Sequence, residues 1–232
     1  MINNNTIFDK FSKDYDAWYK TTMGSFVDKE ESNALFSLLT KKSKAKVLDI
    51  GCGTGNFTYK LHKLDYQVTG IDISREMLHI AEQKNTTHNI PFHLMNGESL
   101  AFDDHTFDAI ISVTAFEFMP YPQAIYEEMK RVVKPDGQII IGTIQKGGSW
   151  EQLYTSDICK GTAYESATFK TLEDIVNLDR DHFVEAKECL FLPPTLNEDQ
   201  YTDTINKEYK SKNVKGGFVC VKFQMNHSSH VK

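Results

Sequence analysis

Short apolar runs and amphipathic stretches alternate through the middle of the chain. The runs are continuous and rich in Val and Ile, which is typical of strands covered on both faces. The stretches between them carry apolar residues three and four positions apart, the spacing of one helix face. The predicted strands are residues 47–50, 67–72, 91–95, 107–113 and 138–143, and the predicted helices are residues 56–64, 75–83 and 121–133.

The two ends of this pattern are less regular. An amphipathic helix is predicted over residues 27–39, before the first strand. Towards the C-terminus, a short helix (171–178) precedes two further strands, 182–192 and 217–223. Because strands alternate with helices over most of the chain, the pattern predicts an α/β protein with a parallel sheet.

Three glycines, Gly51, Gly53 and Gly55, follow the first predicted strand directly. A glycine backbone can adopt positive φ and lets a ligand approach where a Cβ would collide. The helix that begins near Asn56 would point unpaired N–H groups and the positive end of its dipole at that ligand. A dinucleotide site would need a third glycine where Asn56 stands. The spacing therefore indicates a nucleotide-type pocket of another kind, with a glycine-rich turn without a ligand as the alternative.

Residues 47–55 read Val-Leu-Asp-Ile-Gly-Cys-Gly-Thr-Gly. This segment resembles motif I of the class I S-adenosylmethionine (SAM) methyltransferases, V-L-D-x-G-C-G-T-G, and the chain is most similar to the type 11 group. Glu127, Arg131 and the Lys-Pro-Asp-Gly turn at 134–137 resemble a second family segment, E-x-x-R-V-L-K-P-G-G. The resemblance implies a three-layer α/β sandwich with a Rossmann-like, mostly parallel seven-stranded sheet and a closing antiparallel hairpin. It also implies SAM as cofactor and S-adenosylhomocysteine as its product.

The second predicted strand ends in a carboxylate, Asp72. Such a side chain can accept hydrogen bonds from both hydroxyls of a ribose, each contributing about 1.5 to 3 kcal/mol. Helix capping is the alternative role for Asp72, but Ser74 suits that role better because it stands immediately before the next helix. Ile73 and Met77 either flank an adenine or pack their helix on the sheet, since their spacing suits both.

The resemblance implies an adenine-binding loop after the third strand. The family usually has Asp followed by Ala in this loop, whereas this chain has Asn96 and Gly97. An Asn carbonyl can accept a hydrogen bond from the adenine amino group, but without charge assistance. The residues that we expect at the cofactor are Tyr15, Tyr19, Asp49, Gly51, Cys52, Gly53, Gly55, Asp72, Ile73, Met77, Asn96, Gly97, Glu98 and Ser112.

Aromatic residues recur three and four positions apart near the N-terminus, a spacing that is more often a core pattern. In the family, a similar segment folds over the cofactor as a lid. Tyr15 or Tyr19 would then lie near the sulfonium, which an aromatic face attracts. Plain packing remains the alternative. We expect a single domain over residues 1–232, with a helical lid at about residues 1–40.

The strand–helix rhythm is lost over residues 144–171, which contain several aromatic side chains. An insertion after the fifth strand would lie over the rim that holds the glycine turn, where loops often carry specificity. We expect this insertion to cover the substrate, with a structural flap as the alternative. The candidate substrate contacts are Phe116, Trp150 and Tyr154.

Glu117 follows the fourth predicted strand, next to the edge at which a doubly wound sheet binds ligands. It can accept a proton from an amine or hydroxyl nucleophile, or orient that nucleophile. Capping or solvating the following helix is the alternative. Methyl transfer from a sulfonium otherwise needs only alignment of the nucleophile, to which proximity contributes about 7 to 11 kcal/mol. Glu117 is therefore the candidate catalytic residue, and no metal is required.

Length and charge narrow the class of protein. A chain of 232 residues is long enough for one α/β domain and too short for a second complete one. Its net charge of −6 argues against a general nucleic-acid surface. The four cysteines form no C-x-x-C pair, and no apolar run could span a bilayer. Without signal-peptide features, we expect a cytoplasmic protein. The oligomeric state is not predicted.

We therefore expect direct in-line transfer of the SAM methyl group to a nitrogen, oxygen or sulfur atom of a small molecule. Two alternatives stay open. A non-catalytic SAM-binding module would keep the cofactor residues but leave no room for an acceptor. A methyltransferase acting on RNA or protein would carry a basic face beside the pocket. An NAD-dependent oxidoreductase is disfavoured by Asn56.

Overall fold

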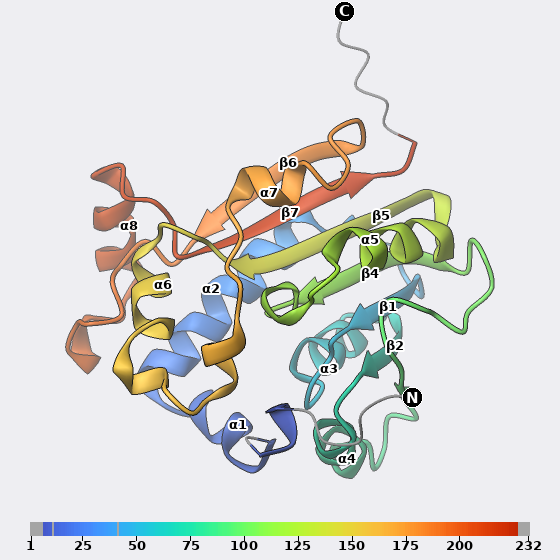
Figure 1. Ribbon diagram of the computed structural model, residues 1–232, viewed down its shortest axis with the longest axis horizontal. Helices are drawn as coiled ribbons and strands as arrows, with labels where there is room; N and C mark the ends of the chain where they lie inside the picture. The colour runs from blue at the N-terminus through green and yellow to red at the C-terminus, as the bar shows by residue number, and fades with distance from the viewer. Residues whose placement is uncertain (1–6, 11, 41, 227–232) are drawn as a thin grey trace, which may run out of the picture.

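The computed structural model describes residues 7–10, 12–40 and 42–226. At its centre is a seven-stranded sheet with the order β3-β2-β1-β4-β5-β7-β6 (Figure 1). Neighbouring strands from β3 to β5 are parallel, and β7 runs antiparallel to both β5 and β6. The strands are β1 (Lys46–Ile50), β2 (Gln67–Asp72), β3 (Phe92–Leu94), β4 (Phe107–Val113), β5 (Val133–Ile144), β6 (Phe183–Cys189) and β7 (Phe218–Gln224).

Helices surround this sheet. The α-helices are α1 (Ser12–Trp18), α2 (Thr22–Leu38), α3 (Asn56–Lys63), α4 (Arg75–Lys84), α5 (Pro122–Val132), α6 (Ser149–Tyr154), α7 (Leu172–Val176) and α8 (Asp203–Ser211). The short 3-10 helices are η1 (Ile7–Lys10), η2 (Phe116–Phe118), η3 (Asp157–Cys159), η4 (Ala163–Ser166) and η5 (Glu198–Gln200).

Alternate residues of the central strands pack on opposite faces of the sheet. In β5, Ile140 belongs to a buried cluster with residues of α2 and α3. Its neighbours Ile139 and Ile141 belong to a second cluster with residues of α5 and α7. Because side chains alternate along a strand, burial of both faces requires the continuous apolar runs that the sequence shows. The predicted three-layer α/β sandwich is confirmed.

The direction of the chain through the sheet reverses between β1 and β4. From β1 the chain proceeds outward to β2 and β3, and from β4 it proceeds the other way to β5. The turns after β1 and β4 therefore diverge and leave a crevice, which is where open α/β sheets bind ligands. Figure 1 shows α6 beyond the arrowhead of β5 and α1 below it, on the side of this crevice.

The elements that differ from expectation lie mostly after residue 130. β5 begins at Val133, so the expected turn at 134–137 is part of a strand whose pairing with β4 is irregular. The antiparallel pair β6–β7 is present, but its connection is long and contains α8. This helix was not predicted, because its residues are mostly polar and its one buried residue is a polar one, Asn206. The region 144–171 contains α6, η3 and η4.

The expected lid at about residues 1–40 divides into two parts. η1 and α1 contact α4 beside the crevice, whereas α2 packs against β5, β6 and β7. Residues 1–6 and 11 lie outside the described residues. The lid therefore remains a prediction for η1 and α1, and α2 belongs to a layer of the sandwich.

Candidate functional site

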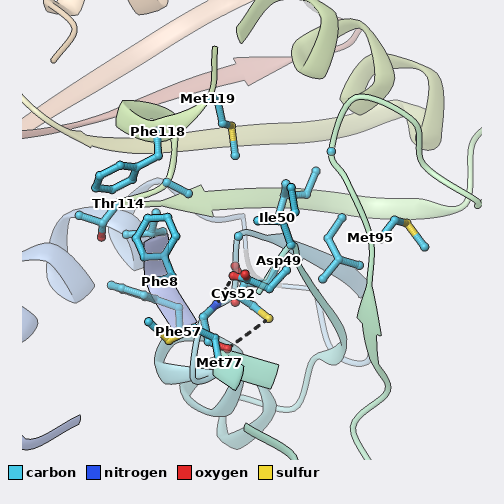
Figure 2. Close-up of a pocket in the computed structure, with 18 of the residues that line it drawn as sticks. Phe8, Asp49, Ile50, Cys52, Phe57, Met77, Met95, Thr114, Phe118 and Met119 are labelled. Atoms are coloured by element: carbon cyan, nitrogen blue, oxygen red, sulfur yellow. Dashed lines mark hydrogen bonds between the residues drawn. The ribbon is translucent and has the colours of Figure 1, made fainter. Parts of the chain in front are cut away.

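A cavity of about 230 Å³ occupies the crevice (Figure 2). The glycine turn after β1, the end of β2 and the segment after β4 form its walls, and η1 and α1 cover it. Twelve of the fourteen residues expected at the cofactor line it: Tyr15, Tyr19, Asp49, Gly51, Cys52, Gly53, Asp72, Ile73, Met77, Asn96, Gly97 and Glu98.

The glycine turn depends on positive φ angles at Gly51, Gly53 and Gly55, which are +73°, +54° and +84°. A Cβ on Gly51 would lie 2.5 Å from the Cβ of Ala115, and a Cβ on Gly55 would lie 2.9 Å from the Tyr59 ring. A Cβ on Gly53 would meet nothing within 4 Å. Packing therefore requires the two outer glycines. Gly53 instead faces an open cradle that a side chain would fill.

Asp72 ends β2 beside this turn and is 8% exposed. Its Oδ2 accepts the Gly53 amide at 2.8 Å, and its Oδ1 accepts the Ser74 amide at 2.7 Å. Burial raises the pKa of this carboxyl, and the two amides oppose the rise. Each oxygen retains a further lone pair for a ligand hydroxyl. Ser74 caps α4 as expected, because its Oγ accepts the Met77 amide at 3.2 Å.

Asp49 lies in β1 and is 2% exposed. Its Oδ2 accepts the Thr58 hydroxyl at 2.5 Å. Burial raises the pKa of Asp49 to about 7, although hydrogen bonds from Thr58 oppose the rise. Gly55, at the N-cap of α3, has no side chain with which to cap the helix. Asp49 therefore anchors the first turn of α3 to the strand before it.

Aromatic residues from two distant segments form part of the wall. Phe8 of η1 and Phe118 of η2 meet edge to face, with ring centroids 4.8 Å apart. Figure 2 shows Phe8 between Phe118 and Met77. Thr114 follows β4 with a φ of +52°, an unusual conformation for a residue other than glycine. This conformation turns the chain along the cavity wall.

Phe8, Thr114 and Phe118 were not predicted as cofactor or substrate contacts. Those after β4 could have been found from their place at the end of a predicted strand, whereas the place of Phe8 depends on how α1 folds back. The lining residues without an assigned role in the sequence analysis are Phe8, Ile50, Asn56, Phe57, Ile71, Met95, Val113, Thr114, Ala115, Phe118, Met119, Pro120 and Ile125.

Hydrogen bonds attach α1 across the cavity mouth. Asp16 accepts the Thr54 hydroxyl at 2.6 Å and pairs with Lys84 of α4 at 2.7 Å. The Tyr15 and Tyr19 hydroxyls lie 3.2 Å apart. Burial raises the pKa of Tyr15 to about 12, so its phenol is protonated at neutral pH. The cover is thus linked both to the glycine turn and to the helix after β2.

Comparisons with known proteins agree with this geometry. A methyltransferase domain model matches residues 48–141. An uncharacterized protein of Methanocaldococcus jannaschii is 30% identical over 220 residues, which cover 93% of this chain and 97% of that protein. The chain belongs to the class I SAM-dependent methyltransferases.

Further similarities concern other methyltransferases. The demethylmenaquinone methyltransferase of Bacillus subtilis is 31% identical to this chain over 140 residues. The match covers 58% of this chain and 60% of the Bacillus subtilis protein. A SAM-dependent methyltransferase of Thermotoga maritima has the same fold, with a TM-score of 0.73 and 24% identity over 94% of this chain and 98% of that chain.

The residues of this methyltransferase fit the SAM that it binds. Gly53 leaves space for a ligand against the backbone, and Asp72 can accept the ribose hydroxyls. Asn96 Oδ1 accepts the Glu98 amide at 3.1 Å, which shapes the loop and leaves a lone pair for the adenine amino group. Met77 is buried, and Ile73 is 40% exposed at the rim. The individual contacts remain predictions.

Gly55 and Ser112 do not line the cavity. Gly55 starts α3 behind the turn. Ser112 is fully buried, and its hydroxyl donates to the Ile50 carbonyl at 2.9 Å. In the structure, both residues support the strands and the turn that carry the lining residues.

Two of the three candidate substrate residues lie in the core of the methyltransferase. Trp150 is 1% exposed, and its indole N–H donates to the Leu192 carbonyl at 2.8 Å. Phe116 is fully buried in the cluster beneath α5. Neither residue lines the cavity, so a direct contact of either side chain with the acceptor stays a prediction that their burial does not favour. Tyr154 differs, because it is half-buried and stacks on Tyr164 with ring centroids 4.2 Å apart.

Glu117 is also buried, at 1% exposed, and does not line the cavity itself. Its Oε1 accepts the Ile144 amide at 2.6 Å, and its Oε2 has no hydrogen-bond partner among the described residues. Burial raises the pKa of the carboxyl, while the Ile144 amide opposes the rise. The prediction that Glu117 solvates the following helix does not fit its burial. Its part in the reaction remains a proposal.

Two further features concern the described residues as a whole. In residues 7–10, 12–40 and 42–226, no helix is long and apolar enough to cross a bilayer. Within the same ranges, no three His, Cys, Asp or Glu side chains gather in a way that could hold a metal ion.

Proposed function

We propose that this methyltransferase transfers the methyl group of SAM to a nitrogen, oxygen or sulfur atom of a small molecule by in-line displacement. The cover formed by η1 and α1 supports a small acceptor, because Phe8 and Tyr15 narrow the cavity beside the glycine turn. The net charge of −6 offers no general attraction for RNA. The Bacillus subtilis relative is named for a small acceptor, demethylmenaquinone.

When bound, SAM supplies an electrophilic methyl group whose leaving group is a neutral thioether. The protein's contribution is then to bind, orient and exclude water. Asp72 positions the nucleoside part, and the glycine turn admits it against the backbone. We propose that α1 acts as the lid and that the region 144–171, with Tyr154, covers the acceptor.

The observation on which this proposal depends most is the open cradle at Gly53. Its φ of +54° and the empty space around its missing Cβ favour close approach of a ligand to the main chain. Gly161 offers a matched comparison, because it also has positive φ and nothing near its missing Cβ, but it lies in the exposed region after η3.

Calorimetry with the Gly53→Ala and Gly161→Ala variants tests the proposal. Both changes should lower the free energy of unfolding by a similar amount, about 1 to 2 kcal/mol, since both place alanine in a left-handed conformation. Only Gly53→Ala should weaken SAM binding, by more than tenfold. Equal SAM affinity in the two variants would contradict the cradle assignment.

A turnover assay then separates the enzyme from a SAM-binding module. Wild-type protein is incubated with methyl-labelled SAM and a panel of thiols, amines, phenols and carboxylates. We expect label transfer to one of these classes. Transfer to protein or RNA instead would contradict the small-molecule acceptor.

A further inference from the structure

A second group of polar side chains lies beside the cofactor cavity. It combines two buried acids with four tyrosine rings, and we call it the acid–tyrosine cluster. Its members come from α1 and the turn that follows it, and from α2, η2, α6 and η4. They are Glu31, Glu117, Tyr15, Tyr19, Tyr154 and Tyr164.

Glu31 lacks a close counter-charge. It is 4% exposed, and among the described residues no group forms a hydrogen bond or ion pair with its carboxyl. The charge of Lys60 lowers the pKa of Glu31, but the Lys60 ammonium is paired with Asp28 and donates a hydrogen bond to Ser32. Burial raises the pKa of Glu31 well above its ordinary value, and the charges of Asp28 and Glu117 add to the rise.

Glu117 provides the second acid. Its Oε1 accepts the Ile144 amide, and a hydrogen bond from the Thr143 hydroxyl also lowers the pKa of the carboxyl, but its buried Oε2 has no close hydrogen-bond partner among the described residues. A buried oxygen without a partner is costly, so it marks a place where a ligand can supply the missing hydrogen bond. The Glu117 carbonyl accepts the Thr168 amide at 2.7 Å, and its neighbour Phe118 packs on Tyr164, which places Glu117 beside the segment that carries Tyr164. The charge of Glu117 also raises the pKa values of Glu31, Tyr15 and Tyr164.

The four tyrosines of the cluster form two pairs. Tyr154 and Tyr164 are stacked, and the Tyr15 and Tyr19 hydroxyls are within hydrogen-bond distance of each other. The Glu31 charge contributes to the raised pKa of all four phenols. Protonated phenols present aromatic faces and hydroxyl groups but no charge of their own.

The cluster is continuous with the cofactor cavity. Tyr15 and Tyr19 line that cavity, and Tyr164 packs on Phe118 with ring centroids 5.5 Å apart. Phe118 in turn points into the hollow next to Phe8 (Figure 2). A molecule in the cluster would therefore lie beside a ligand held at the glycine turn.

We propose that the acid–tyrosine cluster binds the ammonium group of an amine, so that the methyl acceptor is a cationic amine and the product an N-methylated amine. This inference rests on the proposed function. An ammonium compensates two buried carboxyl groups that form no ion pair among the described residues, and aromatic faces stabilise it further. A neutral alcohol leaves these charges uncompensated, and an anionic acceptor is repelled by them.

The step balances with the groups present. The bound ammonium gives one proton to the unpartnered Oε2 of Glu117, which leaves a neutral amine. The amine lone pair forms the new N–C bond while the electron pair of the C–S bond passes to sulfur. The products are the methylated ammonium and S-adenosylhomocysteine. Glu31 keeps its charge and holds the cation during the exchange.

Binding measurements with three probes of similar size test the charge preference. Calorimetry in saturating S-adenosylhomocysteine compares 2-phenylethylamine, 2-phenylethanol and 3-phenylpropionate. The amine should bind at least tenfold more tightly than the alcohol, and the carboxylate should bind most weakly. Amine binding that is absent, or no tighter than alcohol binding, would overturn the proposal.

Variants then assign the preference to the two acids. Glu31→Gln and Glu117→Gln should each weaken amine binding at least tenfold and change S-adenosylhomocysteine affinity less than twofold. Glu82→Gln removes an exposed carboxylate of α4 and is the matched control, which should change neither affinity. Unchanged amine affinity in both cluster variants would contradict the assignment.

Thermal unfolding without ligand distinguishes binding from folding. Glu31→Gln should unfold at an equal or higher temperature, because it removes a buried carboxyl group that no hydrogen bond or ion pair of the described residues compensates. A large loss of stability would show instead that the fold requires this carboxylate. S-adenosylhomocysteine binding by the wild type separates the two proposals: its loss contradicts the proposed function, and its retention without amine preference contradicts only the cluster.

Discussion

The four buried carboxyl groups around the site differ in what holds them. Asp72 accepts two backbone amides, and Asp49 accepts the Thr58 hydroxyl. Glu117 uses only one of its oxygens, and Glu31 uses neither with the described residues. Hydrogen bonds from the protein offset the desolvation cost of a buried carboxyl group and hold the groups that donate them in place. The acids with fewer donors retain capacity to bind a ligand.

Replacement of Asp72 by alanine tests the ribose assignment at this scale. We expect SAM affinity to fall at least tenfold, equivalent to about 1.4 kcal/mol, because the ribose acceptors and the bond to the Gly53 amide are both lost. Titration calorimetry measures the change. Asp103→Ala, at an exposed carboxylate, is the control. Equal affinity in the Asp72 variant would remove this residue from the cofactor site.

At the scale of elements, the position of α1 depends on a few side-chain contacts. The helix has seven residues, too few to be stable by itself. Asp16 connects it to the glycine turn through Thr54 and to α4 through Lys84. These two contacts differ in strength, since the hydroxyl bond is half-buried and the ion pair is largely solvated.

Stopped-flow measurements of SAM dissociation test whether α1 acts as a lid. Asp16→Ala should raise the dissociation rate about fivefold, corresponding to about 1 kcal/mol for a lost hydrogen bond. Lys84→Ala removes only the ion pair and should change the rate less than twofold. If Asp16→Ala releases SAM at the wild-type rate, α1 does not restrain the cofactor.

At the scale of the whole molecule, burial of acids makes stability depend on pH. Carboxyl groups with lowered pKa values, such as Asp174 and Asp179, are ionised in both the folded and the unfolded state above pH 5. They therefore do not make the free energy of unfolding depend on pH in that range. Asp49 differs, because its pKa rises from 3.8 in the unfolded chain to about 7 in the fold. Between these values the folded state holds the proton that the unfolded chain has released. Stability contributed by this group is therefore lost as pH rises towards 7.

Urea unfolding of the ligand-free protein at pH 5 and pH 8 checks this sign. Asp49 should lower the free energy of unfolding by about 2 to 3 kcal/mol over that interval. In Asp49→Asn, whose amide oxygen can still accept the Thr58 hydroxyl, this part of the decrease should disappear. A variant whose pH dependence matches the wild type would contradict the raised pKa of Asp49.

Local sequence determined the α/β pattern, the glycine turn and the acid at the end of β2. Each of these depends on neighbouring residues: continuous apolar runs indicate strands covered on both faces, and glycines permit positive φ. The family, the fold and the cofactor predicted from these residues were confirmed. The sequence also placed Glu117 near the site, because it follows a strand at the ligand-binding edge.

Tertiary structure decided which distant side chains share the cavity. The spacing of aromatic residues is the same on a helix that packs on the core and on one that covers a ligand. The sequence therefore could not show which of Trp150 and Tyr154 belongs to the core. Packing placed the first in the core and the second against Tyr164. The electrostatic interaction between Glu31 and Glu117 likewise has no local signal, because these residues lie on α2 and η2, which are distant in sequence.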